Sequence, residues 1–178
     1  WEGSKIVEWD AESKDIIWSW NSFNYFTMDD YDKYSGHRSS SWNSTFNESY
    51  DWLHTNSIFF DEAESAIYVS YRHLSRITKI DYPRGDIIWN MGLPAKHMAT
   101  GDQNICTDLL FSFQHHGRLL DNGHLTFFDN GNLSKILFNQ SEQTSRALEI
   151  EIIDNSSCNI IWEYVLEPEL YGYSLGSV

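Results

Sequence analysis

The chain has 178 residues, of which 41% are hydrophobic and 16% aromatic, so it can form a globular core and is not disordered in composition. Its formal net charge of −14 argues against a nucleic-acid partner, because an acidic surface repels phosphate backbones. No stretch approaches the ~20 consecutive apolar residues of a membrane helix, so we expect no membrane insertion. The sequence starts without Met or a signal-peptide core and stops where a strand would begin, so we expect a piece of a longer protein.

Three segments repeat along the chain, at residues 5–21, 77–93 and 148–165. Each is an apolar run, a polar turn and then Asp or Asn followed by Ile-Ile-Trp. The matching tryptophans, Trp18, Trp89 and Trp162, are spaced by 89 − 18 = 71 and 162 − 89 = 73 residues. A near-constant period built on strand–turn–strand units predicts a repeat architecture.

Two further strands precede the second and third units, and tight-turn residues such as Asp121-Asn122-Gly123 join them. Each complete unit therefore has four antiparallel strands, a to d, as in a propeller blade. The fold class predicted is an all-β, β-propeller fragment of about two and a half blades; a β-sandwich with an internal duplication is the alternative. The ranges are 1–21 for strands c and d of one blade, 54–92 and 114–166 for two whole blades, and 167–178 for the start of the next.

Polar side chains gather where the d-to-a and b-to-c connections leave this predicted fold, and both connections emerge on the same face. The candidates for an anion-binding pocket are His54, Asn56, Arg72, Gln114, His115, Asn130 and Arg146. Arg146 could instead pair with an acidic neighbour such as Glu149, and Asn130 could serve turn geometry. We interpret His37, His97 and His124 as structural residues. No carboxylate or Cys stands at ligand spacing beside the candidate histidines, so we expect no metal and no cofactor.

The cysteines and the glycosylation sequons concern the compartment and the covalent structure. Cys106 is in a d-to-a connection and Cys158 in a c-to-d turn on the opposite rim, so we predict that they are not bonded to each other. Sequons predict glycosylation and a secreted or extracytoplasmic protein; they begin at Asn43, Asn47, Asn132, Asn139 and Asn155.

Several strings, in order and at matching spacing, resemble the arylsulfotransferase family that uses no nucleotide sulfate donor. They are residues 51–57, 70–75, 87–92, 113–115, 128–131 and 145–149. The resemblance implies a six-bladed propeller that moves a sulfuryl group from an aryl sulfate ester to a phenol. It also implies that His115 is the nucleophile, through a sulfo-histidine, and that His54, Asn56 and Arg72 bind the sulfuryl oxygens. The choice of His115 over His116 depends on the family pattern alone.

Two other functions fit the same residues. The chain could belong to a catalytically silent secreted propeller that acts as a structural or adhesion glycoprotein. It could also be a module that binds a sugar or a small anion without chemistry. Only the joint presence of His54, Arg72 and His115 favours the enzyme, with aryl sulfates and phenols as its small-molecule partners.

Overall fold

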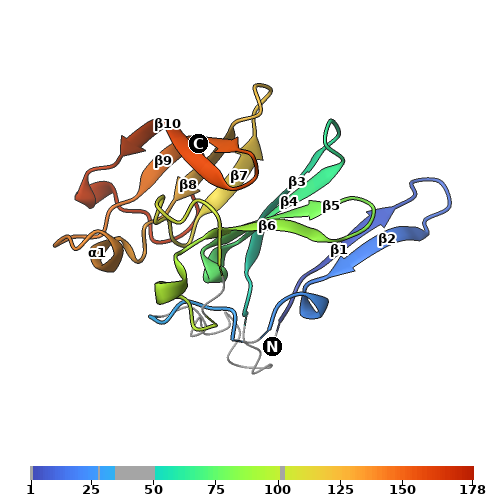
Figure 1. Cartoon of the computed structure of the whole chain (residues 1–178), viewed down its shortest axis with the longest axis horizontal. Coiled ribbons are helices and arrows are strands. Elements are labelled where there is room, and N and C mark those ends of the chain that lie inside the picture. The colour runs from blue at the N-terminus through green and yellow to red at the C-terminus, as the bar shows by residue number, and fades with distance from the viewer. Residues whose placement is uncertain (1, 28, 35–50, 101–102) are drawn as a thin grey trace.

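A computed structural model describes residues 2–27, 29–34, 51–100 and 103–178 of the chain. The described residues form ten strands in three antiparallel sheets, one short helix α1 (Ser134–Leu137) and four 3-10 turns (Figure 1). The strands are β1 Lys5–Trp9, β2 Ile16–Asn21, β3 Thr55–Asp61, β4 Ala66–Tyr71, β5 Arg76–Asp81, β6 Ile87–Gly92, β7 His115–Leu119, β8 Leu125–Asp129, β9 Arg146–Ile153 and β10 Ser157–Val165. The all-β prediction is confirmed. No helix in these ranges is long and apolar enough to cross a bilayer.

The sheet topology is that of successive propeller blades. Strands β3 to β6 form one four-stranded sheet in chain order, β7 to β10 form a second, and β1 pairs with β2 in a third. The innermost strands β3 and β7 lie side by side. They are joined by hydrogen bonds from Asn56 Nδ2 to the Gln114 carbonyl (2.7 Å) and from the Gly117 amide to Ser57 Oγ (3.0 Å). The described residues therefore have the architecture of propeller blades, and their sheets do not close into a ring.

Apolar side chains fill the space between the two complete blades. Tyr68 of β4 and Trp89 of β6 face Phe127 of β8 and Leu148 of β9 in one buried cluster. Phe111, from the connection between the blades, is fully buried in the same cluster. A second cluster joins β2 to the sheet of β3–β6. Burial of these faces explains why a single blade would not be stable alone.

The repeated tryptophans link each blade to the next. The Trp18 indole N–H donates to the Pro83 carbonyl (2.7 Å), and the Trp89 indole donates to Asn155 Oδ1 (2.8 Å). Both acceptors lie in the hairpin turn between the third and fourth strands of the following blade. Trp162, at the same place in the last blade, is 47% exposed. The Ile-Ile-Trp repeat thus marks a contact between blades.

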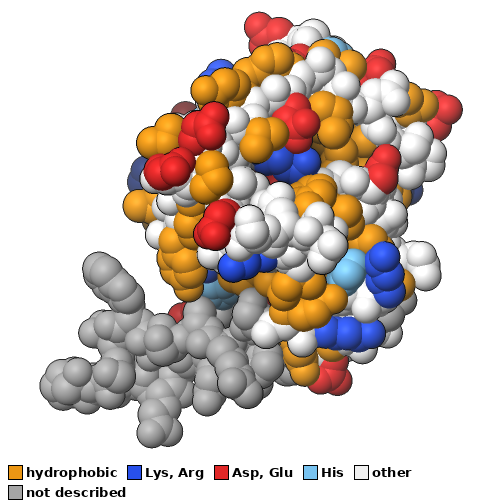
Figure 2. All heavy atoms as spheres, turned by 90° about the vertical axis from the view of Figure 1, so that its left-hand side faces the viewer, with side chains coloured by type: hydrophobic (Ala, Val, Ile, Leu, Met, Phe, Trp, Pro, Cys, Tyr) orange, Lys and Arg blue, Asp and Glu red, His pale blue; other side chains and the backbone are white. Residues whose placement is uncertain are grey.

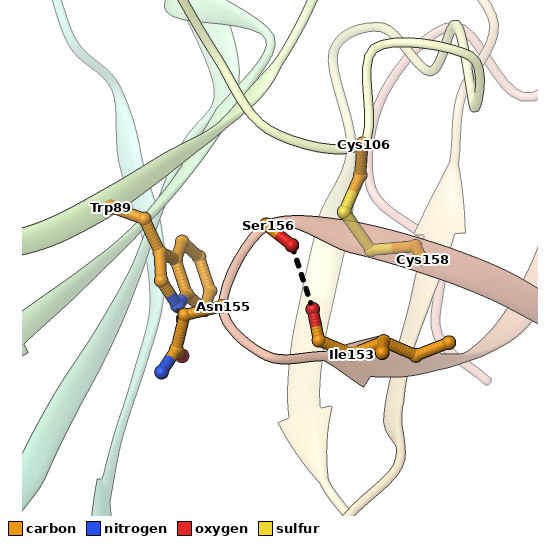
Figure 3. The surroundings of a disulfide bond; sticks show 6 residues. All are labelled: Trp89, Cys106, Ile153, Asn155, Ser156 and Cys158. Atoms are coloured by element: carbon orange, nitrogen blue, oxygen red, sulfur yellow. Dashed lines mark hydrogen bonds between the residues drawn. A yellow bond between two sulfur atoms is a disulfide. The ribbon is translucent and has the colours of Figure 1, made fainter.

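The prediction that the cysteines are unpaired is wrong, because Cys106 and Cys158 form a disulfide with their Cα atoms 5.2 Å apart (Figure 3). Cys158 was expected in the c-to-d turn, but it lies in β10, one residue after the strand begins. The prediction failed because the connection between β6 and β7 does not stay on the rim of the propeller. Ile105 returns to pair with β6, donating to the Asn90 carbonyl (2.8 Å), and the chain then enters the apolar space between the blades. Cys106 is 6% exposed there and reaches β10.

Candidate functional site

The candidate site is built from strand ends that meet beside the innermost strands. Residue 54 immediately precedes β3, residue 72 follows β4, and residue 115 begins β7. The Arg72 amide donates to the His54 carbonyl (3.1 Å), which ties the b-to-c turn to the start of β3. The pairing of Asn56 with Gln114 and of Ser57 with Gly117 brings the starts of β3 and β7 to the same end of the fold.

His115 is a buried imidazole with one nitrogen fixed by an amide. Its Nδ1 lies 2.6 Å from Asn130 Oδ1, while Asn130 Nδ2 donates to the Gly172 and Leu175 carbonyls (2.7 and 2.8 Å). Because those bonds orient the amide, Nδ1 of His115 is the donor and Nε2 carries the lone pair. Burial, together with the charges of Arg72 and His54, lowers the pKa of His115 despite the Asn130 bond. The ring is therefore neutral and nucleophilic at neutral pH.

His54 is held differently, by a carboxylate. Asp51 Oδ1 accepts from the His54 amide (2.9 Å), and Asp51 Oδ2 accepts from His54 Nδ1. The side chain of His54 is 44% exposed, and its φ of 49° lies in the left-handed region. The sequence analysis did not single out Asp51, although its position three residues before His54 was visible.

Arg72 is a buried cation with an unused donor. Its guanidinium lies over the Phe113 ring (4.9 Å to the centroid) and the Tyr173 ring (5.6 Å), and Nη2 donates to the Tyr173 carbonyl (3.1 Å). Nε is buried without a hydrogen-bond partner. Such a donor is suited to an oxyanion. Tyr173 was missed by sequence reasoning, since it belongs to the next d-to-a connection.

Asn56 and Gln114 have different surroundings. Asn56 uses Nδ2 on the Gln114 carbonyl, and its Oδ1 is buried without a partner. Gln114 is fully buried, and its Nε2 donates to Ser70 Oγ (2.9 Å) and to the Arg76 carbonyl (2.9 Å). Gln114 therefore joins the two blades and sets the backbone that precedes His115.

The sequence model of the arylsulfotransferase (ASST) family matches residues 2–178. The chain belongs to the arylsulfotransferase family. No curated protein sequence matches it significantly. Membership supports an activity of the aryl sulfotransferase type and small-molecule substrates.

Arg146 uses its donors inside the protein. Nε donates to Asp129 Oδ2 (2.7 Å), Nη1 to Glu163 Oε1 (2.8 Å), and Nη2 to the Leu109 carbonyl. Burial opposes the charge, but Asp129 and Glu163 raise the pKa of Arg146. The acidic partners of Arg146 are therefore Asp129 and Glu163, and Glu149 is not one of them.

The histidines interpreted as structural have protein partners where the structure describes them. His124 Nδ1 lies 2.7 Å from Glu149 Oε1, which accounts for that carboxylate. His97 Nδ1 lies 2.7 Å from the Tyr34 hydroxyl. His37 is outside the described residues.

One group of side chains has the composition of a metal site. Ligand atoms of Asp51, His54 and His73 lie within 4.8 Å of one another, so the statement that no carboxylate stands beside these histidines is wrong. His73 is buried, its Nδ1 donates to the Asp51 carbonyl (2.6 Å), and burial lowers its pKa to about 4. Both Nδ1 atoms are already bonded to Asp51, and the charge of Arg72 acts on His73. We assign no metal to this group.

The sequons have unequal surroundings. Asn139 is exposed. Asn155 is also exposed, although its Oδ1 accepts the Trp89 indole. Asn132 is half-buried and its Nδ2 donates to the Tyr173 carbonyl (3.1 Å), so a glycan there would break this bond. Asn43 and Asn47 lie outside the described residues.

Proposed function

We propose that this protein transfers a sulfuryl group from an aryl sulfate ester to a phenolic acceptor through a sulfo-histidine at His115. The observation that carries the proposal is the state of His115: a neutral imidazole, fixed at Nδ1 by Asn130, within range of the charges of Arg72 and His54. Such a ring can attack sulfur without a separate base. No cofactor is needed.

The first half-reaction forms a bond between His115 Nε2 and sulfur while the bond from sulfur to the phenolic oxygen breaks. The second half-reaction reverses this with the acceptor phenol, so the imidazole is regenerated. By analogy with phosphoryl transfer, the transition state is loose and its charge is spread over the peripheral oxygens. Preformed donors stabilise that charge, and Arg72 has a buried N–H without a protein partner.

The complete enzyme would need further blades, which we propose are supplied by flanking sequence to give a six-bladed ring. Two exposed apolar faces of the structure support this proposal of further blades. On the last sheet, Trp162 and Tyr164 are 47% and 58% exposed, and on the first hairpin Trp9 is 66% exposed. A cavity of about 360 Å³ separates β1–β2 from β3, where the inner strands of the first blade would lie. Apolar faces of this kind are typical of surfaces that contact protein.

We further propose that the protein is made in the secretory pathway as a glycoprotein. The disulfide of Cys106 and Cys158 supports an oxidising compartment, because such bonds are rare in reducing ones. The exposed Asn139 offers a place for a glycan. Acidic side chains scattered over the face shown in Figure 2 are consistent with high solubility.

The test is turnover of an aryl sulfate that releases a coloured phenol, in the presence of a second phenol. We expect transfer that is lost in His115→Asn. The matched control is His116→Asn at the neighbouring position, where Nδ1 of the imidazole accepts from the Val178 amide instead. Loss in both variants, or in neither, would contradict the assignment of His115.

A binding module is the second candidate, since Arg72 could retain an anion without reaction. The silent structural or adhesion glycoprotein is the third. Calorimetric binding of the aryl sulfate without release of phenol would favour the module. Neither binding nor turnover would favour the structural role.

A further inference from the structure

We propose that Asp51 is a positioning residue for His54, and that this pair carries the proton of the transfer reaction. The inference deepens the proposed function and depends on it. It assigns the leaving-group proton to His54, whereas His115 takes the sulfuryl group.

The carboxylate of Asp51 fixes both the backbone and the ring of His54. Oδ1 accepts from the His54 amide (2.9 Å) and Oδ2 from Nδ1. A left-handed φ of 49° is unfavourable for a residue with a side chain, so it must be held by its neighbours. The Arg72 amide holds the His54 carbonyl from the other side (3.1 Å).

Asp51 is itself held in place. Its carbonyl accepts from Nδ1 of the buried His73 (2.6 Å), whose ring lies against that of His54 with centroids 4.7 Å apart. Burial opposes ionisation of Asp51, but the hydrogen bond from His54 and the charges of both histidines lower the pKa of its carboxyl. Asp51 is therefore an anion at neutral pH, and its carboxylate holds the proton on Nδ1 of His54.

The proton balance follows from this geometry. With Nδ1 bonded to Asp51, His54 presents Nε2 to the site. The first half-reaction begins with both ring nitrogens of His54 protonated, and when the bond from sulfur to the donor oxygen breaks, Nε2–H gives its proton to the departing phenolate. When the acceptor phenol attacks sulfo-His115, Nε2 takes the phenolic proton, and the pair returns to its starting state. The charged groups close to His54 are Asp51 and Arg72, and the titratable groups that remain neutral there are His73 and His115.

The test compares good and poor leaving groups in Asp51→Asn, which retains an oxygen for the His54 amide and removes the charge. With phenyl sulfate, whose phenolate needs a proton, we expect kcat to fall about 100-fold, as for loss of a general acid. With 4-nitrophenyl sulfate we expect a change of less than about fivefold, because a weakly basic leaving group needs little protonation.

The matched control is Asp61→Asn at the other end of β3. Asp61 Oδ1 caps the Ala63 amide (3.0 Å) in the same way, and we expect neither substrate to be affected. Equal losses with both sulfates in Asp51→Asn would show a purely structural role and overturn the inference, as would no loss with either. Failure of the proposed function itself is distinguishable, since wild-type protein would then release no phenol from either substrate.

Discussion

Two segments of the chain, 51–56 and 111–116, bring a histidine to the start of an innermost strand, yet they treat it in opposite ways. His54 is 44% exposed at its side chain and is bonded to a carboxylate. His115 is 6% exposed and is bonded to the amide oxygen of Asn130. The carboxylate of Asp51 accepts the Nδ1 proton of His54, whereas burial beside an amide lowers the pKa of His115 and leaves that ring neutral. The proton carrier and the nucleophile that we propose therefore lie near the start of the innermost strand in two successive blades.

Replacing each histidine should give the largest difference between the two segments. His115→Asn removes the attacking nitrogen, so we expect transfer to fall at least about 1000-fold with every aryl sulfate. His54→Gln should still form the sulfo-enzyme from 4-nitrophenyl sulfate, because His115 is intact. Single-turnover kinetics measure both. Similar residual rates in the two variants would contradict the division of roles.

The second segment is anchored covalently. The disulfide links Cys106, nine residues before His115, to β10 across a sequence separation of 52 residues. Cys106→Ser combined with Cys158→Ser should lower the free energy of unfolding by about 4 kcal/mol, mainly through the unfolded state. Denaturant unfolding measures it, with the reduced wild-type protein as control. A loss below about 1 kcal/mol would show that the connection is held by packing alone.

The first segment is anchored by a titratable group instead. Because the pKa of His73 is about 4 in the folded protein, against an ordinary value of 6.5, the unfolded chain binds the proton first as the pH falls. The contribution of the neutral His73 to the free energy of unfolding is therefore fully present above pH 6.5. It falls by about 3 kcal/mol as the pH is lowered toward 4. His73→Gln should be less stable at pH 7 and should show a flatter pH dependence in urea unfolding. An unchanged slope between pH 6.5 and 4 would assign the titration to other groups.

Changing the residue that is hydrogen-bonded to Nδ1 of His115 should have the smallest effect on the rate of transfer. Asn130→Asp places a carboxylate on His115 and should raise its pKa, against the opposing charges of Arg72 and His54. We expect about tenfold slower transfer near neutral pH, with recovery as the pH rises and the ring loses its proton. A pH–rate profile of the first half-reaction measures this. A profile that keeps the wild-type shape would show that the partner of Nδ1 does not control reactivity.

The same two segments show what the sequence could and could not predict. The spacing of Trp18, Trp89 and Trp162 predicted the outer hairpins and, through the order of strands in a blade, the connections where His54 and His115 lie. Asp51 was missed because a backbone turn, invisible in an apolar pattern, brings its carboxylate onto His54. The disulfide was missed because the connection after β6 turns inward with Cys106.

The roles of Arg146 and Tyr173 also depend on contacts that the sequence does not reveal. Arg146 could be read as a ligand residue or an ion-pair partner from sequence, and only the positions of Asp129 and Glu163 distinguish these roles. Tyr173 follows the last strand, and nothing in its local sequence indicates that its carbonyl would meet Arg72. Local sequence patterns therefore predicted the strands, whereas the contacts between the segments that connect the strands could be identified only from the structure.

The central claim is that His115 accepts the sulfuryl group, and rapid-quench mass spectrometry tests it most directly. Protein mixed with 4-nitrophenyl sulfate, without an acceptor, should release one phenol per molecule and gain one sulfuryl group. Peptide mapping under alkaline conditions should place the group on His115, and the label should disappear when phenol is added. Release of phenol with no label, or a label on His116 or His54, would contradict the account.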